Sequence, residues 1–593
     1  MIEKSEKEQF EDWVEKIDAA EKIYKPYYEL IDETRNFYKD NHNPHRGHYN
    51  IFWSTIETLK PFLYFKQPQF YIERQNKSLE KVERAACVIL ERALTWNLAQ
   101  FDFDSVIKYA RNDFLISGTG IVWEQYKPEF FSVPNPVAPQ EGLQVKREEK
   151  VETIYVDPKD FLADGKAAGV WEEIGWLARK IYMDAEEAEK NFNVNDMQMS
   201  GTICVYEIWD KKTRKVYWLS KSYSGRFLRV SGDVLGVKNF FPCPKPIWAT
   251  QTNDSLIPVP DYCLIKEMLN ELNGITNRMR LTMQALKVSG AYDNSFPELA
   301  DILSKDVTLV SVNDFVKLRE NGGIRGIIDF VPLEQYVSAL EQLARRRQDI
   351  ISGIFDITGV SDIMRGNSDA SETATAVIKK TNFGALRNQD RQNDMQRFIR
   401  DLLRIKAEII CEYFSADKLL SFLPEELKKD TKVSMAAVNL LKTEKLRGML
   451  FSVETGNLLN QSEENTATVS AVECVSKMIR EALMTVSQQP KLLPLYRSMT
   501  EAVVSTMPRA RCFETVLENV FNGIEQELSL PPPQEQVNLQ PNSKQLVEMQ
   551  KNILKNKELN IKAKIEADKL AFADKELSVQ SRLKQCQLQA EKV

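Results

Sequence analysis

Two long segments with helical spacing of apolar residues bracket a short stretch of mixed character, and this arrangement constrains the fold most. In the first segment, apolar side chains recur at intervals of three and four residues: Leu264, Met268, Leu272, Ile275, Met279, Met283 and Leu286. Such spacing places them on one face of an α-helix. With Asp261 as the N-cap behind Pro258 and Pro260, the pattern predicts a helix of about 26 residues.

A second helix is predicted after Pro332, and it ends by Gly359. Its apolar face comprises Leu333, Val337, Leu340, Ala344, Ile351 and Ile354. Between the helices, VSGAYDNS and VTLVSV indicate strands, SFPELADILS a short helix and ENGGIRG a tight turn. The two helices therefore enclose a small α/β insertion. An ordinary helical hairpin with a decorated loop explains the same pattern equally well.

The chain before Pro258 combines helices with short strands. Helical patterns cover residues 5–40, 79–99 and 102–117, and an apolar helix follows Asn50 that we expect to break at Pro61. Alternation at 67–75 and 171–182 predicts strands, and three short runs within 203–231 predict a β-meander. The predicted fold class is therefore mainly α with β insertions (α+β).

The chain beyond the second helix is predicted to be mostly helical. Residues 360–370 form a polar loop, a long helix follows, and further helices fill 434–526 before a proline-rich linker. From Lys544 onward no glycine or proline interrupts the helical pattern. Two ladders of residues seven apart run along it: Ala563, Leu570 and Leu577, and Ile565, Phe572, Val579 and Cys586. Two seams suit a helix with a neighbour on each side, and a single irregular amphipathic helix is the alternative.

Net charge, cysteine spacing and the length of apolar stretches limit the classes of protein to which the chain can belong. The chain of 593 residues has a net charge of −6, although residues 541–593 hold 11 basic and 7 acidic side chains, a net of +4. Proteins that grip DNA through its phosphates usually present a basic face. The eight cysteines form no CxxC pair, which indicates reduced thiols inside a cell. No stretch approaches the roughly 18 apolar residues of a membrane span, and the charged N-terminus lacks the apolar core of a secretory signal.

All three histidines lie in one short segment, NHNPHRGHYN, as His42, His45 and His48. On a helix, the HxxHxxH spacing would gather three imidazoles as metal ligands. Pro44 and Gly47 favour turns instead. We therefore interpret the segment as an exposed connector, with a metal site as the alternative.

No motif in the chain indicates catalysis. There is neither a GxSxG elbow nor a GxxxxGK[ST] phosphate loop, and SGTGIVWE lacks the third glycine of GxGxxG. We expect no enzyme activity and no cofactor. The sparse basic clusters are Arg345–Arg347, Lys379–Lys380 and Arg365. A triple arginine on a helix surface is more often solvated or ion-paired than bound to phosphate.

Several segments carry, through their order, a resemblance to a known family. They are NIFWSTIETLKPFLYFKQPQFYIERQ (50–75), DFLISGTGIVWEQYKP (113–128), YVDPKDFLAD (155–164), WEEIGWLARKIYM (171–183), PDYCLIKEMLNELNGITNRM (260–279) and SDASETATAVIKK (368–380). The chain resembles tailed-bacteriophage portal proteins, the head-to-tail connectors, of the short-tailed-phage type with a C-terminal helical barrel. The resemblance extends diffusely over residues 50–540.

The resemblance implies a portal fold built from consecutive parts. These are a wing (1–257), a first stem helix (258–288), a clip (289–331), a second stem helix (332–357), a tunnel loop with a long wing helix (358–414), a crown (415–530), a linker (531–543) and a barrel helix (544–593). The histidine segment then falls in the wing, where a connector is unremarkable. The missing phosphate motifs agree with a family whose packaging motor resides in a partner.

The resemblance also implies site residues. The tunnel loop and the DNA channel would include Arg365, Asn367, Asp369, Lys379 and Lys380. The clip would dock partners through Asp293, Asn294, Glu298, Asp301 and Lys305. The seams of the barrel would include Leu570, Phe572, Leu577 and Val579.

The expected assembly is a closed ring, usually of twelve copies, at one capsid vertex of the virion, assembled in the host cytoplasm. Double-stranded DNA would pass through it during packaging and ejection. The implied partners are the terminase large subunit, tail adaptor or head-completion proteins, and the major capsid and scaffolding proteins, without a membrane. An acidic body would let DNA slide rather than bind. A metal-dependent enzyme using the histidine segment and an intracellular helical scaffold protein are the alternatives.

Overall fold

The structure is a computed structural model, and the chain divides into two compact units, residues 1–470 and 471–593. Only part of the chain is described. The described residues are 5–39, 49–74, 81–133, 143–164, 169–193, 201–223, 225–285, 290–292, 315–320, 322, 328–330, 334–360, 363–365, 374–424, 428 and 430–454, with isolated positions 473, 477, 493–495, 497–499 and 521.

A five-stranded antiparallel sheet lies against the N-terminal helix α1 (Glu6–Tyr38). Its strands, in spatial order, are β4 (Phe161–Ala163), β5 (Trp176–Asp184), β6 (Thr202–Asp210), β7 (Lys215–Leu219) and β8 (Arg229–Ser231). A capping box between Ser5 and Glu8 starts α1. Aromatic side chains of α1 cover the sheet, for example Trp13 edge-on to Trp176 with ring centroids 5.7 Å apart.

The predicted meander is present as β6 to β8, whereas the strand predicted at 171–182 starts later. Residues Trp171–Glu173 form a short 3-10 helix, η2, and β5 begins at Trp176. Glu172 and Glu173 are exposed one after the other, which is incompatible with the in–out alternation of a half-buried strand. A short helix, α5 (Ala185–Phe192), follows β5, and a second 3-10 turn, η1 (Pro158–Asp160), precedes β4.

A long hairpin of β2 (Thr119–Val133) and β3 (Leu143–Val156) follows helix α4 (Phe103–Ser117), and the short strand β9 (Ile247–Trp248) pairs with the start of β2. Gly118 ends α4 with φ of +86°, a conformation that favours glycine. Gly120 packs so tightly on α4 that an added Cβ would lie 2.3 Å from the carbonyl oxygen of Ala110. Both glycines of SGTG are therefore structural.

A two-stranded sheet joins segments far apart in the sequence. Strand β1 (Gln69–Arg74) pairs antiparallel with β12 (Met449–Glu454), with Ile72 opposite Phe451. Helix α3 (Lys81–Gln100) packs against β1, and α12 (Ala416–Ser421) and α14 (Thr431–Glu444) pack against α3. Sequence analysis predicted only helix over 434–526, so β12 corrects that prediction. It passed unrecognised because its partner strand lies near the other end of this unit's sequence.

Helix α2 (Ile51–Leu63) continues through Pro61, contrary to the predicted break. Pro61 costs the helix only the one hydrogen bond that its own N–H would have donated to the carbonyl oxygen of Glu57, and two helical residues follow it. The Arg111 guanidinium of α4 donates to the carbonyl oxygens of Lys60 and Tyr64, at 3.2 and 2.6 Å. These bonds satisfy carbonyl groups at the helix end, and the cation favours the negative end of the helix dipole.

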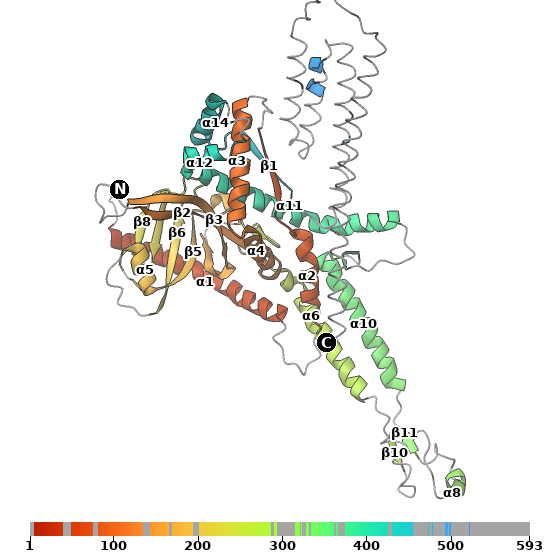
Figure 1. The fold of residues 1–593 in the computed structure, drawn as a ribbon. Coiled ribbons are helices and arrows are strands. Elements are labelled where there is room, and N and C mark those ends of the chain that lie inside the picture. The colour runs from red at the N-terminus through yellow and green to blue at the C-terminus, as the bar shows by residue number, and fades with distance from the viewer. Residues whose placement is uncertain are drawn as a thin grey trace, which may run out of the picture. The chain divides into compact units, whose positions relative to one another are not determined.

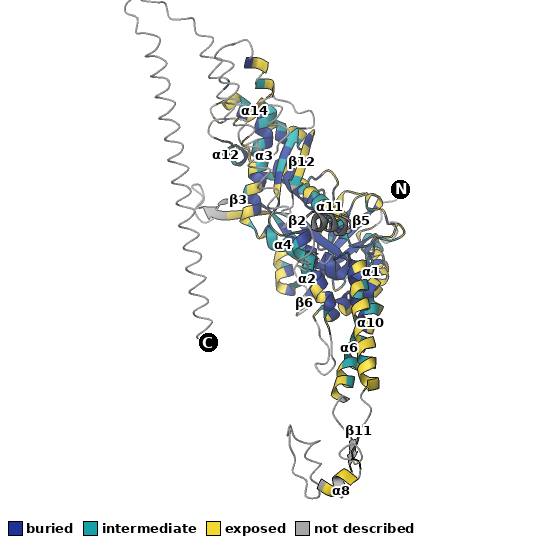
Figure 2. Cartoon of the chain, turned by 90° about the vertical axis from the view of Figure 1, so that its right-hand side faces the viewer, coloured by how far each residue is buried: buried dark blue, intermediate teal, exposed yellow. Residues whose placement is uncertain are grey.

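Two 25-residue helices, α6 (Asp261–Ala285) and α10 (Glu334–Thr358), lie side by side (Figure 1). Beyond them, β10 (Gly290–Tyr292) pairs antiparallel with β11 (Ile328–Phe330), and α8 (Phe315–Glu320) lies between these strands in sequence. After α10 come η4 (Ile363–Arg365) and the 40-residue helix α11 (Ala374–Tyr413). Figure 2 shows the exposed first turns of α10 and the buried surroundings of its end.

The predicted α+β class is confirmed at the level of mixed helices and small antiparallel sheets. In the part of the chain that the structure describes, no helix is long and apolar enough to span a membrane. The buried core runs from α2, α3 and α4 through β2 to α11. It also includes the N-terminal half of α6 and the C-terminal turns of α10.

Candidate functional site

The helix pair α6–α10 is the candidate functional site, and the burial of α6 differs from the sequence prediction. Its buried stripe consists of Tyr262, Ile265, Leu269, Leu272 and Ile275. The predicted face shared Leu272 and Ile275 but also included Leu264 and Met283, which are 50% and 64% exposed. The stripe of α6 that contacts the core is therefore rotated around the helix axis by about 45° or more from the predicted stripe.

Helix α10 is buried only in its last two turns. Ile350, Ile351, Ile354, Phe355 and Thr358 are buried, whereas residues 334–339 are all exposed. Gly359, with φ of +72°, follows the helix, as the sequence predicted. The first turns of α10 therefore carry apolar side chains without a covering layer in the described structure.

Close packing and one ion pair join the two helices. A Cβ added to Gly353 would lie 2.6 Å from Met268 Cε, so this glycine lets α10 approach α6. Arg346 donates to both carboxylate oxygens of Glu271, from Nε at 2.9 Å and from Nη2 at 3.1 Å. This fork geometry fixes the helices in register. Within the triple arginine, Arg346 is thus ion-paired, as sequence analysis favoured.

One turn of α11 contacts three helix ends: the C-terminus of α10, the N-terminus of α6 and the C-terminus of α2. Asn388 Nδ2 donates to the carbonyl oxygen of Gly359 behind α10, at 2.9 Å. Arg391 pairs with Asp261, the first residue of α6, at 2.7 Å. Gln392 Nε2 donates to the carbonyl oxygen of Phe62 in α2, at 2.9 Å. Residues spaced by three and four share a helix face, so this single face of α11 sets the base of the helix pair.

The carboxylate of Asp261 also suits its position for an electrostatic reason. It is the first residue of α6, and a negative charge near a helix N-terminus interacts favourably with the helix dipole. Its side chain is 8% exposed, and the Arg391 side chain is 18% exposed. Burial of this kind makes the ion pair costly to break.

Helix α1 braces α6 from another side. Lys266 Nζ lies 2.7 Å from Glu33 Oε1, and the Tyr262 hydroxyl donates to the same oxygen at 3.0 Å. The Lys266 ammonium lowers the pKa of Glu33 below its ordinary value, with the Tyr262 hydroxyl acting in the same direction. The ionised carboxylate is therefore the form that the folded structure prefers.

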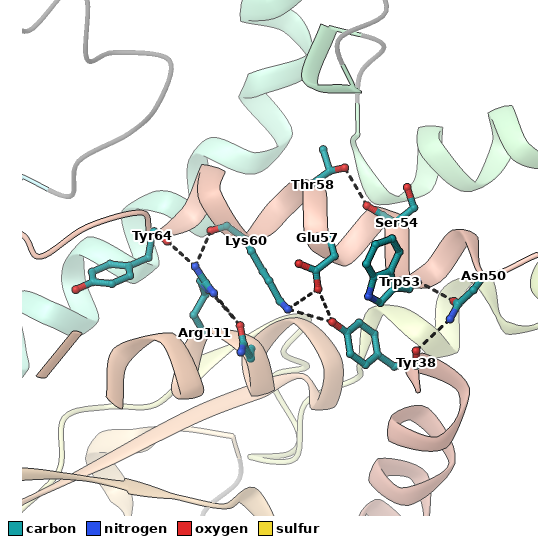
Figure 3. Close-up of polar contacts among 10 residues, drawn as sticks. Tyr38, Asn50, Trp53, Ser54, Glu57, Thr58, Lys60, Tyr64 and Arg111 are labelled. Carbon is teal, nitrogen blue, oxygen red and sulfur yellow. Dashed lines mark hydrogen bonds and ion pairs between the residues drawn. The ribbon is translucent and has the colours of Figure 1, made fainter. Parts of the chain in front are cut away.

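A polar network connects the end of α1 with α2 (Figure 3). The Tyr38 hydroxyl donates to Glu57 Oε1 at 2.5 Å, and Lys60 Nζ donates to the same oxygen at 2.6 Å. Burial alone would raise the pKa of Glu57, but hydrogen bonds from Lys60 and Tyr38 lower it below the ordinary value. Burial has the largest effect on the pKa of Tyr38 and raises it, and the hydrogen bond with Glu57 raises it further. The network stabilises structure near the helix pair.

An open hollow of about 470 Å³ lies along the far half of α6. Its lining consists of Thr276, Met279, Arg280, Met283, Gln284 and, from α10, Arg347. The floor is thus apolar and the two charged side chains are both basic. Arg347 also lies over the Tyr49 ring, 4.4 Å from its centre. A hollow of this character suits an apolar side chain accompanied by negative charge.

The far end of α11 is anchored by a buried ion pair that sequence analysis missed. Lys406 Nζ lies 3.1 Å from Glu124 Oε2 of β2, and their side chains are 2% and 0% exposed. Burial raises the pKa of Glu124 and lowers that of Lys406. The Thr153 hydroxyl and the carbonyl oxygen of Val151 complete the site. Helix α11 is therefore fixed to the sheet at one end and to the helix pair near its middle.

The predicted tunnel-loop residues are described only in part. Arg365 is placed with its guanidinium 3.7 Å from the ring centre of Phe355, which brings it against the end of α10. Lys379 and Lys380 belong to α11, but their side chains lie outside the described structure, as do Asn367 and Asp369 entirely. Arg365 is thus the one residue of the five whose side chain the structure describes.

The other predicted site residues lie outside the described residues. They are the clip residues Asp293, Asn294, Glu298, Asp301 and Lys305, the barrel residues Leu570, Phe572, Leu577 and Val579, and the histidines His42, His45 and His48. Among the residues that are described, no group of three or more His, Cys, Asp or Glu side chains is arranged to hold a metal ion.

No known protein family matches the chain, and no curated protein matches it.

Proposed function

We propose that the chain is the subunit of a portal, a closed ring at one capsid vertex through which double-stranded DNA enters and leaves. The observation that carries this proposal is the helix pair α6–α10, buried at one end and followed at the other by the insertion 289–331. At 1.5 Å per residue each helix is about 37 Å long. A ring of such pairs makes a channel wall of corresponding height.

The exposed apolar side chains of the helix pair support assembly rather than an isolated chain. Leu264, Leu281 and Met283 of α6 and Tyr336 and Val337 of α10 are between 42% and 64% exposed. A contact that repeats with a fixed rotation closes into a ring when the rotation divides a full turn. Neighbouring copies would then cover these side chains, and the helix pairs would become the stem of the portal.

The charge of the chain supports a channel through which DNA slides. A net charge of −6 per copy becomes −72 in a ring of twelve. Such a particle does not gain the counterion-release energy that holds DNA-binding proteins on phosphate. In this proposal the motor activity comes from the terminase large subunit. The clip residues 289–331 dock it first and the tail adaptor or head-completion proteins later.

The first experiment is the mass of the purified full chain in solution by native mass spectrometry, with electron microscopy of the same sample. A species at twelve times the 68.3 kDa mass of the chain, or one subunit either side, with a central channel in the images supports the portal. Dimers or filaments would instead indicate a helical scaffold. A small species carrying one metal ion per chain would return attention to His42, His45 and His48.

A further inference from the structure

The hollow lies on one flank of the helix pair, where Arg347 of α10 completes a lining otherwise formed by α6. The contacts of α6 with α10 include Met268 and Glu271. At about 100° per residue, Arg280 and Gln284 lie on the opposite side of α6 from these two contacts. The hollow thus opens on that flank of the pair, with Met283 64% exposed in it.

A segment of complementary character lies on the opposite edge of the pair. The contacts of α10 with α6 include Gly353 and Arg346, and helical spacing places Val337, Glu341 and Ala344 on the other side of α10. Residues 334–341, EQYVSALE, hold two glutamates and no lysine or arginine. The six residues lining the hollow include two arginines and no acidic side chain.

The hollow and the segment 334–341 lie at the same height along the axis of the helix pair. Met268 faces Gly353, and the helices run in opposite directions. Met283 lies as far beyond Met268 in the sequence as residue 338 lies before Gly353. Equal separations in sequence at the same rise per residue give equal distances from the crossing point. A rotation about an axis parallel to the pair keeps that level, so it can bring one edge against the other.

We propose that residues 334–341 of one copy dock into the hollow of the next copy, with Val337 near Met283 and with Glu334 and Glu341 near Arg280 and Arg347. The inference rests on the proposed ring and names the contact that closes it. The occupant is a second copy because the hollow and the segment are different surfaces, carry opposite charges and lie at the same height along the helix pair. A head-to-tail contact requires these three properties. Within one chain, Glu334 and Glu341 lie on the other side of α10 from Arg347, by roughly 140° and 120° around the helix axis, so the segment does not reach the hollow of its own copy.

The test uses two full-length variants, Met283→Cys and Val337→Cys, mixed during assembly and then treated with a mild thiol oxidant. Both positions are exposed, so each variant is expected to fold, and circular dichroism checks this. The mixture is expected to give a disulfide-linked dimer, at twice the 68.3 kDa mass of the chain, on a non-reducing gel. Each variant alone gives the background from the native cysteines, because a head-to-tail contact does not bring identical residues together.

Charge reversal provides an independent readout. Arg280→Glu and Glu341→Arg are each expected to lower the fraction of chain in rings by about tenfold, because like charges then meet. The chain carrying both changes is expected to recover most of that loss. Glu187→Arg, an exposed reversal on α5, is the matched control and is expected to leave assembly unchanged.

The outcomes separate this contact from the ring itself. If the unaltered chain forms rings but the mixed variants give no dimer above background and the double reversal recovers nothing, the docking contact is wrong and the portal proposal stands. If the unaltered chain forms no ring under any condition tried, both fall. A dimer in the mixture with recovery in the double reversal establishes the contact.

Discussion

Three side chains of α11 determine how the helix pair is attached to the rest of the chain. Asn388 is 1% exposed, and with Arg391 and Gln392 it bonds groups at the near ends of α10, α6 and α2. None of the three was predicted, because Gln389, Asp390 and Asn393 around them are equally polar. A pattern of polar residues on a helix does not distinguish those that meet a distant partner from those that meet water.

Replacement of Arg391 by alanine is expected to destabilise the fold. It leaves the nearly buried Asp261 carboxylate without its cation, which we expect to lower the free energy of unfolding by about 2 kcal/mol. Arg400→Ala is the matched control on the same helix, since Arg400 is 48% exposed and pairs with its neighbour Asp401, so its loss costs less than about 0.5 kcal/mol. Urea unfolding of the full chain measures both, and equal losses would contradict the assigned role of Arg391.

Glu57 is expected to contribute a pH-dependent part of the stability. Its folded-state pKa lies below the ordinary value of 4.5, so the ionised group stabilises the fold above that pH. The contribution disappears as the pH falls through the folded-state pKa. At pH 7 we expect Glu57→Gln to cost about 0.5 kcal/mol, a small value because the side chain is 38% exposed. Urea unfolding at pH 7, 5, 4 and 3 should show the difference from the unaltered chain shrinking below pH 4.5, and a constant difference would exclude this explanation.

At the level of elements, Gly353 sets the spacing of α6 and α10. Gly353→Leu inserts a side chain where Met268 already lies, and we expect it to lower the free energy of unfolding by about 2 kcal/mol. Gly353→Ala needs only a small movement of the flexible Met268 end and gains helix propensity, so its net effect should stay within about 1 kcal/mol. Chemical denaturation compares them. A leucine tolerated as well as alanine would mean that the helices are not held in contact here.

The elements predicted best are those whose signal is local. Both helices of the pair follow from apolar periodicity and from Pro260 and Gly359 at their ends, and β6 to β8 follow from short apolar runs between turns. Predictions failed where contacts between residues far apart in the sequence determine the structure. The buried stripe of α6 was misplaced because Leu264 and Ile265 are equally apolar. The rings of Phe37 and Phe52 pack on Tyr262, which shares a helix face with Ile265, and Ile265 rather than Leu264 is buried. Strand β12 was missed because its pairing with β1 is invisible in local sequence.

For the molecule as a whole, the proposed function requires that DNA pass without being held. We therefore expect the purified particle to bind a 30-base-pair duplex of arbitrary sequence more weakly than about 10⁻⁵ M at about 0.15 M salt. The acidic chain offers few sites at which phosphate charges are neutralised. Fluorescence anisotropy at several salt concentrations measures this affinity. Tight binding that falls steeply with salt would reveal a continuous basic surface and would contradict a sliding channel.

The basic tail is the place where residual affinity should arise. Residues 541–593 carry a net charge of +4, so reversing two lysines, Lys555→Glu with Lys557→Glu, brings the tail to zero. At low salt we expect this variant to bind the duplex severalfold more weakly than the unaltered particle, with a smaller dependence of affinity on salt. The matched control, Lys7→Glu with Lys16→Glu on α1, makes the same charge change in the body. If both variants lose affinity equally, binding follows net charge and the tail has no particular part in it. If only the tail variant loses affinity, the terminal segment is the DNA-contacting part of a particle whose body leaves the duplex free to move.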